Sequence, residues 1–140
     1  MNNDIIFFKE VVFLDLNKKV AFVTGASIGL GKGLIEELSK NGCNVIIGYN
    51  KSKEKAEWLK KNIEEKYNVK SLSIKCDVTD ENSIKNTITY IVDNFGKIDI
   101  VINNAAYAQD NYIYDKTKEE FMKVLETNLV GPFLVSKYAY

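Results

Sequence analysis

The sequence predicts a doubly wound α/β fold, and three observations support this. Short runs rich in β-branched residues alternate with longer segments in which apolar residues recur every three or four positions, as buried strands and amphipathic helices require. Glycine, asparagine or aspartate follows the ends of these segments and marks the turns between them. The alternation calls for right-handed βαβ crossovers and an open, mostly parallel sheet.

The expected strands are short, and an amphipathic helix follows each of them. The strands cover residues 18–24, 44–49, 69–76 and 98–102. The third alternates polar and apolar residues, whereas the fourth is nearly all apolar. The apolar positions on the inner faces of the first three helices are Leu30, Leu34 and Leu38; Ala56, Leu59, Ile63 and Tyr67; and Ile84, Ile88, Ile91 and Phe95.

Local signals indicate where the helices begin and bend. Ser52 is expected to cap the second helix, and Thr79 or Asp80 the third. Residues 117–120 have the T-x-x-E pattern of a capping box, which begins a fourth helix after a polar, tyrosine-rich loop. We expect this helix to bend near residues 131–132, because a Gly-Pro pair weakens a helix.

Composition excludes several classes of function. Lys plus Arg and Asp plus Glu each number 19, so no net field favours nucleic acid or an anionic membrane surface. The chain has no histidine, which excludes Ser-His-Asp triads and the usual zinc sites, and we expect no metal site. No apolar run reaches the roughly 20 residues that span a bilayer, and Cys43 and Cys76 fit buried free thiols. We therefore expect a soluble, cytoplasmic protein without a targeting signal, with residues 1–17 as an N-terminal extension.

A glycine-rich turn, TGASIGLG at residues 24–31, lies between the first strand and the first helix. Gly25 permits a sharp turn, Gly29 lets the backbone approach a pyrophosphate, and Gly31 allows the helix to pack closely on the strand. Backbone N–H groups at the helix N-terminus then face the anion. The alternative is a tight βα turn without a ligand. The residues expected to bind the cofactor here are Thr24, Gly25, Ala26, Ser27, Ile28, Gly29 and Gly31.

The spacing of this turn, TGxxxGxG, resembles that of the short-chain dehydrogenase/reductases. Three further motifs follow in the order of that family: Asp77-Val78, Asn103-Asn104-Ala105-Ala106 and Asn128-Leu129-Val130-Gly131. The resemblance implies a Rossmann-type sheet with strand order 3-2-1-4, truncated before the later strands, and a partial NAD(P)-binding domain over residues 18–140. Residues 44–57 and 75–84 resemble the 3-oxoacyl-carrier-protein reductase or glucose dehydrogenase group.

By this resemblance, Asp77 accepts a hydrogen bond from the adenine amino group, and the backbone of Val78 completes recognition of the ring. An Asx turn or a helix cap is the alternative for Asp77. Asn104 and Ala105 line the cofactor crevice. Ala106 stands where the family has glycine. We expect this difference to change only the fine geometry of the crevice.

The end of the second strand bears on the choice of cofactor. Folds that select NAD place Asp or Glu there to bind the ribose 2′-hydroxyl, whereas this chain has Tyr49. Because a carboxylate would repel a 2′-phosphate, its absence favours NADP(H) over NAD(H), and Lys51 and Lys53 supply positive charge just beyond. Against this, Ile28 stands where many NADP-using relatives carry Arg. The alternative for both lysines is a solvated helix start.

The resemblance implies one catalytic residue within the chain. In the family a Lys activates a Tyr, a Ser positions the substrate oxygen, and an Asn holds a proton-relay water while hydride passes to or from the nicotinamide. Only the Asn has a counterpart, Asn128, expected on the inner face of its helix with Phe121 and Val124. The alternative is a core asparagine whose hydrogen bonds are satisfied within the protein.

The expected function is that of an oxidoreductase acting on a small carbonyl or alcohol substrate. We expect NADP(H)-linked carbonyl reduction or alcohol oxidation, as in 3-oxoacyl-carrier-protein reductases, by a homo-oligomer in the full-length form. Residues 18–140 lack the family's catalytic Tyr and Lys, so we expect a fragment that is inactive alone, with an open edge on the strand at 98–102. The alternative is a non-catalytic nucleotide-binding or subunit-interaction module.

Overall fold

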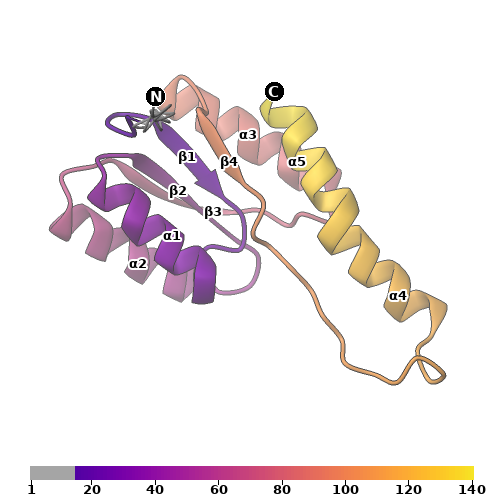
Figure 1. The fold of residues 1–140 in the computed structure, drawn as a ribbon. Coiled ribbons are helices and arrows are strands. Elements are labelled where there is room, and N and C mark those ends of the chain that lie inside the picture. The colour runs from indigo at the N-terminus through magenta and orange to yellow at the C-terminus, as the bar shows by residue number, and fades with distance from the viewer. Residues whose placement is uncertain (1–14) are drawn as a thin grey trace, which may run out of the picture.

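A computed structural model describes residues 15–140, so residues 1–14 of the expected N-terminal extension lie outside the described part. Strands and helices alternate in the expected order (Figure 1). The strands are β1 Val20–Val23, β2 Asn44–Tyr49, β3 Ser71–Lys75 and β4 Ile100–Ile102. The helices are α1 Gly29–Lys40, α2 Lys53–Lys66, α3 Glu81–Phe95, α4 Lys118–Leu125 and α5 Gly131–Ala139, with a π-helical segment, η1 Glu126–Val130, between the last two.

The strands form one parallel sheet in the order β3-β2-β1-β4, which confirms the predicted topology. β1 is central and pairs with β2 along its whole length. On its other side β1 pairs with β4, with Ala21 opposite Ile100 and Val23 opposite Ile102. The first two crossovers run in the same direction along the sheet and the third runs back past β1, so right-handed connections place α1 and α2 on one face of the sheet and α3 and α5 on the other (Figure 1).

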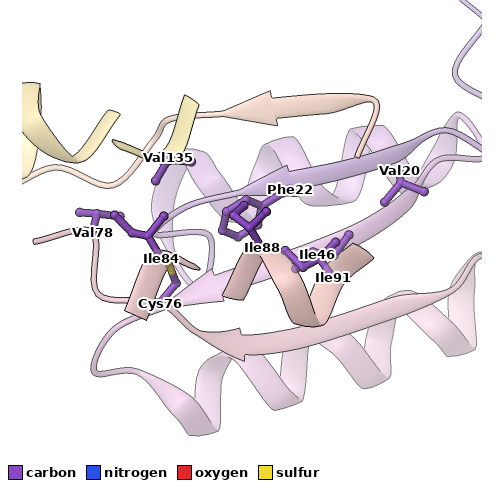
Figure 2. Packing of buried hydrophobic residues seen from close by; sticks show 9 residues of the cluster. All are labelled: Val20, Phe22, Ile46, Cys76, Val78, Ile84, Ile88, Ile91 and Val135. Carbon is purple, nitrogen blue, oxygen red and sulfur yellow. The ribbon is translucent and has the colours of Figure 1, made fainter. Parts of the chain in front are cut away.

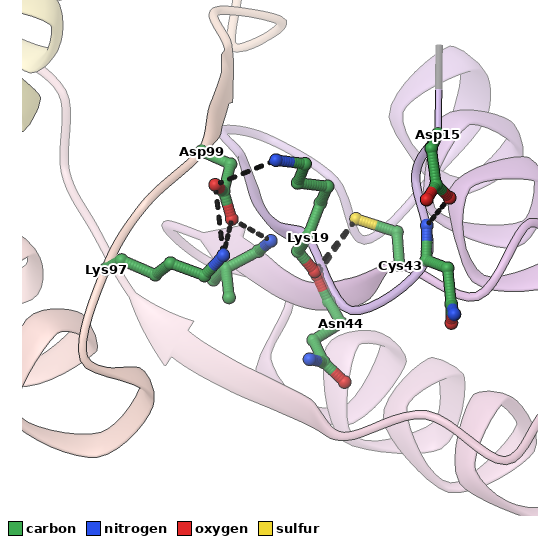
Figure 3. Close-up of polar contacts among 8 residues, drawn as sticks. Asp15, Lys19, Cys43, Asn44, Lys97 and Asp99 are labelled. Carbon is green, nitrogen blue, oxygen red and sulfur yellow. Dashed lines mark hydrogen bonds and ion pairs between the residues drawn. The ribbon is translucent and has the colours of Figure 1, made fainter. Parts of the chain in front are cut away.

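β1 and β4 begin later than the sequence predicts, because a side chain replaces the strand ladder at their amino-terminal ends. The Asp99 carboxylate accepts a hydrogen bond from the Val20 N–H at 2.8 Å, and the Asp99 N–H donates to the Val20 carbonyl at 2.9 Å. Lys97 and Lys19 flank this carboxylate, with Nζ–O distances of 2.9 and 3.7 Å (Figure 3). The hydrogen bond from Lys97 holds the pKa of Asp99 below its ordinary value.

The core consists of two apolar layers, one on each face of the sheet. In one layer Phe22 and Ile46 pack with Ile84 and Ile91 of α3 and with Val135 of α5 (Figure 2). The other layer joins the sheet to α1 and α2; its buried members are Val23, Ala26, Ile35, Val45, Ile47, Tyr49, Ala56, Leu59 and Ile63. Successive residues of β1 and β2 therefore face opposite layers, as strand geometry requires.

The inner face of α1 differs by one position from the predicted one. Leu30 is 75% exposed, so its assignment to the inner face is wrong, and the later leucines of that stripe are only half-buried. Gly31, Ile35 and Ser39 are buried instead. The reason is that Gly31 packs directly against the preceding turn, which directs the neighbouring Leu30 outward.

The helix caps follow the local signals in part. Asp80 caps α3 by accepting a hydrogen bond from the Asn82 N–H at 2.9 Å. The predicted capping box at residues 117–120 is confirmed. Ser52 lies at the N-cap of α2, but its hydroxyl makes no capping hydrogen bond. The expected inner face of the fourth helix is wrong at Phe121, which is 53% exposed, and at Asn128, which is also exposed, whereas Val124 is half-buried.

The irregularity in the last helical segment lies at η1, just before the predicted bend at residues 131–132. The Gly131 N–H donates to the Glu126 carbonyl across the π turn. Pro132 has no N–H, so the Asn128 carbonyl lacks its usual donor four residues along. A Cβ at Gly131 would lie 2.9 Å from the carbonyl oxygen of Val78. The start of α5 therefore approaches the segment after β3 very closely.

Candidate cofactor-binding site

The predicted site residues gather at the carboxyl ends of the four parallel strands. Thr24 follows β1, Tyr49 ends β2, Asp77 follows β3 and Asn104 follows β4. Because β1 lies between β2 and β4, the glycine turn after β1 sits at the middle of this edge. Open parallel sheets bind ligands in the crevice at this edge.

The backbone of the glycine turn needs glycine at three of its positions for two different reasons. Gly25 and Gly29 have φ angles of +61° and +57°, a left-handed conformation that side chains disfavour. A Cβ at Gly25 would lie 2.8 Å from the Ala105 Cα, whereas nothing lies within 4 Å of the corresponding position at Gly29. At Gly31 the same atom would meet the Asn104 Nδ2 at 2.6 Å. The turn is therefore closed toward β4 and open at Gly29.

Several backbone N–H groups of this turn have no partner within the protein. The Lys32 N–H donates to the Ile28 carbonyl at 3.3 Å and forms the first hydrogen bond of α1. The N–H groups of Gly29, Leu30 and Gly31 precede it and find no acceptor among residues 15–140. The Ala26 N–H, by contrast, donates to the Gly48 carbonyl at 2.8 Å, so it holds the turn to β2.

Thr24 and Asn104 hold the turn to the end of β4. The buried Thr24 hydroxyl accepts hydrogen bonds from the N–H groups of Asn104 and Ala105, at 3.1 and 3.0 Å. The Asn104 side-chain amide donates to the carbonyls of Thr24 and Gly25, at 2.9 and 3.0 Å. The Asn104 amide hydrogens are therefore both engaged in shaping the crevice.

Asp77 and Val78 lie at the start of the loop after β3. Asp77 Oδ1 accepts hydrogen bonds from the Thr79 N–H at 3.0 Å and from the Thr79 hydroxyl at 2.7 Å, which is the Asx-turn arrangement. Partial burial of Asp77 opposes ionisation, but the hydrogen bonds from Thr79 and Asn50 and the charge of Lys75 together outweigh it and hold the pKa of Asp77 below its ordinary value. Val78 is buried against the core.

Tyr49 and Lys51 occupy different environments at the end of β2. Tyr49 is only 8% exposed and belongs to the buried layer beneath α1 and α2. Lys51 is exposed in the turn that follows. The sequence did not single out a groove of about 370 Å³ that neither residue lines; its lining consists of residues 27–29 with Lys32, Glu54, Lys55 and Trp58. The only sequence signal for this groove is that residues 54 and 55 lie four and three positions before residue 58 in the predicted helix. This spacing places the three side chains on one face of α2.

Asn128 lies in η1 and contacts the loop that follows β4. Its Oδ1 accepts from the Tyr107 N–H at 2.8 Å, and its Nδ2 donates to the Tyr107 carbonyl at 2.9 Å. The ammonium group of Lys123 lies 4.5 Å from the centroid of the Tyr107 ring. The Asn128 side chain thus joins η1 to the loop after β4 at Tyr107.

Comparison with known proteins identifies the family. Residues 19–140 match the family model described as short chain dehydrogenase, so the chain belongs to the short-chain dehydrogenase family. Members of this family are oxidoreductases that bind a nicotinamide cofactor. The family assignment agrees with the parallel sheet, the glycine turn and the crevice described above.

The chain is similar to several characterised proteins and spans about half of their length. It is 39% identical over 115 residues to the 3-oxoacyl-[acyl-carrier-protein] reductase FabG of Staphylococcus aureus, covering 82% of this chain and 46% of that protein. A mutant short-chain dehydrogenase/reductase of Serratia marcescens superposes with a TM-score of 0.83 at 28% identity, covering 90% and 51% of the two chains. A blue fluorescent protein from a metagenomic library, solved in complex with NADPH, superposes with a TM-score of 0.84 at 26% identity, covering 90% of this chain and 51% of that protein.

No helix within residues 15–140 combines the length and the apolar character needed to cross a membrane.

Proposed function

We propose that this chain is the nucleotide-binding part of an NADP(H)-dependent oxidoreductase that reduces a small carbonyl compound or oxidises the matching alcohol. The glycine turn carries the proposal. It presents the unpartnered N–H groups of Gly29, Leu30 and Gly31 on the first turn of a helix, beside a position at Gly29 with no atom within 4 Å. That combination suits a pyrophosphate, which needs backbone donors at close range.

The remaining residues fit the rest of a dinucleotide. Residues 24–31 would hold the pyrophosphate, Asp77 and Val78 the adenine, and Asn104 with Ala105 the inner wall of the crevice. When bound, the nicotinamide supplies hydride exchange with a substrate carbon. The absence of a carboxylate at Tyr49 supports NADP(H), as do the NADPH in the complex of the similar blue fluorescent protein and the similarity to a 3-oxoacyl-carrier-protein reductase.

Asn128 is proposed to act through its main chain. Both polar atoms of its side chain are bonded to Tyr107, and its carbonyl oxygen lacks the N–H that Pro132 cannot supply. This carbonyl is therefore a suitable acceptor for a water molecule that relays a proton. Because residues 15–140 hold no Tyr and Lys in the family's positions after Asn128, we expect the chain alone to bind cofactor without turnover.

Titration of the 140-residue chain with NADPH and with NADH, followed by calorimetry, tests the proposal. We expect saturable binding of NADPH, weaker binding of NADH, and no oxidation of NADPH when short-chain ketones are added. Failure of both dinucleotides to bind would refute the proposal. Robust turnover would show that the catalytic groups have been wrongly assigned.

A second candidate is a non-catalytic interaction module within a larger assembly. The observation that favours it is the exposure of large apolar side chains on η1 and α5, with Leu129 64% and Phe133 63% exposed in the described chain. Sedimentation of the purified chain distinguishes the two, because an interaction module without a ligand would self-associate or bind a partner while ignoring both dinucleotides.

A further inference from the structure

The segment between β4 and α4, residues 103–117, is the longest connection within residues 15–140 and runs away from the sheet (Figure 1). Its tip, residues 110–115, is exposed, whereas Tyr107, Gln109 and Lys116 at its base are half-buried. Only Ala105 of this segment packs against the apolar core. Because so little of the loop is held by apolar packing, the polar contacts at its base decide its course.

A chain of side-chain hydrogen bonds, which we call the Gln109 bridge, joins Tyr107 to Glu120 of α4. The Tyr107 hydroxyl donates to Gln109 Oε1 at 2.7 Å, and Gln109 Nε2 donates to Glu120 Oε1. The other carboxylate oxygen of Glu120 accepts from the Thr117 N–H at 2.8 Å in the capping box. Glu120 therefore has two roles, since one of its oxygens caps α4 and the other holds the loop through a charge-assisted hydrogen bond.

Two further contacts restrain the base of this loop. The Lys116 ammonium group donates to the Gln109 carbonyl at 3.0 Å. The Asn128 side chain holds the main chain of Tyr107 through the pair of hydrogen bonds described above. Tyr107 is thus held at its main chain by η1 and at its hydroxyl, through the Gln109 bridge, by α4.

The order of the strands indicates which part of a dinucleotide lies near Tyr107. The glycine turn follows β1, Asp77 follows β3 at one edge of the sheet, and Tyr107 follows β4 at the other edge. With the pyrophosphate on the glycine turn and the adenine at Asp77, the nicotinamide half extends toward β4, because a dinucleotide binds across the crevice at this end of the strands. Asn104 and Ala105 form the crevice wall there, and Tyr107 continues it two residues further along the chain.

We propose that Gln109 and Glu120 are positioning residues for the nicotinamide half of the cofactor. They act through Tyr107, whose place beside the crevice depends on the Gln109 bridge, and not by contact with the cofactor. This inference rests on the proposed function, because it presumes a dinucleotide on the glycine turn. Loss of the bridge should therefore weaken binding of the whole dinucleotide and leave binding of its adenylate half unchanged.

Two ligands separate the halves of the cofactor in a test that requires no catalysis. NADPH contains both halves, whereas adenosine 2′,5′-bisphosphate lacks the nicotinamide. The 140-residue chain is titrated with each ligand by calorimetry, and the emission of the dihydronicotinamide ring of NADPH reports on the surroundings of that ring. We expect the unmodified chain to bind NADPH more tightly than the bisphosphate and to increase the emission of NADPH.

Q109E breaks the bridge, because it places a second carboxylate against that of Glu120. This variant should bind NADPH about five- to tenfold more weakly, as loss of one hydrogen bond to a charged group would cause. Its affinity for the bisphosphate should not change. In the double variant Q109E/E120Q the introduced carboxylate accepts from the Tyr107 hydroxyl and from the introduced amide, whose oxygen still accepts from the Thr117 N–H. The double variant should therefore regain most of the lost affinity for NADPH.

Two control variants separate the bridge from its surroundings. N111A removes an exposed amide of the same loop, whose hydrogen bonds stay within residues 111–115, and it should bind both ligands as the unmodified chain does. T117A removes the hydroxyl that accepts from the Glu120 N–H and leaves the Gln109 bridge in place. It should lower the melting temperature without weakening the binding of NADPH.

The outcomes separate this inference from the proposed function. Unchanged affinity of Q109E for NADPH, or equal affinity of the unmodified chain for both ligands, overturns the positioning role but leaves nucleotide binding intact. An equal loss for both ligands in Q109E, or no recovery in the double variant, also overturns it. If the unmodified chain binds neither ligand, the proposed function and this inference both fail. Thermal unfolding checks that each variant folds, and Q109A, which removes the bridge without adding charge, replaces Q109E if that variant does not fold.

Discussion

Replacement of Gly31 by alanine tests the architecture of the glycine turn most directly. The added Cβ would lie 2.6 Å from the Asn104 Nδ2, 2.8 Å from the Ala26 Cα and 2.9 Å from the Gly25 carbonyl oxygen. Two of these three atoms belong to the backbone of the turn, which cannot rotate away. Asn104 must therefore move and give up its hydrogen bonds to the carbonyls of Thr24 and Gly25.

The expected loss of stability follows from these contacts. Two hydrogen bonds contribute about 1–3 kcal/mol together, and displacement of packed backbone costs about 1–3 kcal/mol more. The better helix propensity of alanine offsets about 1 kcal/mol. The free energy of unfolding of G31A should therefore fall by about 1–5 kcal/mol, a large part of the total of a typical domain.

Gly33 offers a matched control in the same helix. It is exposed, and nothing lies within 4 Å of the position that its Cβ would take. G33A should therefore stabilise the chain by up to about 1 kcal/mol through helix propensity alone. Urea unfolding followed by circular dichroism, with NADPH titration of each variant, makes the comparison. If G31A unfolds at the same urea concentration as G33A and binds NADPH equally well, the close contact with Asn104 has no energetic role.

Three further predictions concern single groups. G29A should lose about 1–2 kcal/mol of stability because of its φ of +57° and should bind NADPH more weakly, since the methyl group fills the open approach; calorimetry showing undiminished affinity would contradict this. Because the folded pKa of Asp77 is below its ordinary value of 3.8, its contribution to stability is present above that value and is lost as the pH falls through the folded pKa. The melting temperature of D77N should accordingly depend less on pH in the acid range, and identical acid profiles would remove this role. Burial raises the pKa of both cysteine thiols, that of Cys43 to about 11, so both should resist a disulfide reagent at about pH 8 until urea unfolds the chain, and rapid labelling of the folded chain would argue against this burial.

The order of strands and helices was predictable from the sequence because its signals are local. Hydrophobic periodicity is set by the backbone geometry of each element, and caps such as Asp80 and the box at residues 117–120 act over three residues. The parallel sheet order followed from the family resemblance and from the alternation of elements, and the structure confirms it. The first residues of β1 and β4 could not be predicted in this way. The Asp99 side chain, which is distant from β1 in the sequence, takes the hydrogen bond of the Val20 N–H that a neighbouring strand would otherwise accept.

Contacts between distant segments decided the details of the candidate site. The sequence by itself determined that a turn with glycine at 25, 29 and 31 joins a strand to a helix at the carboxyl-terminal edge of the sheet. Only the tertiary structure placed Asn104 against Gly31, bound the Asn128 side chain to Tyr107, and brought Lys55 to the groove. The physical reason is that a side chain's partners depend on how separate elements pack, and this packing is not encoded in the spacing of residues within any one element.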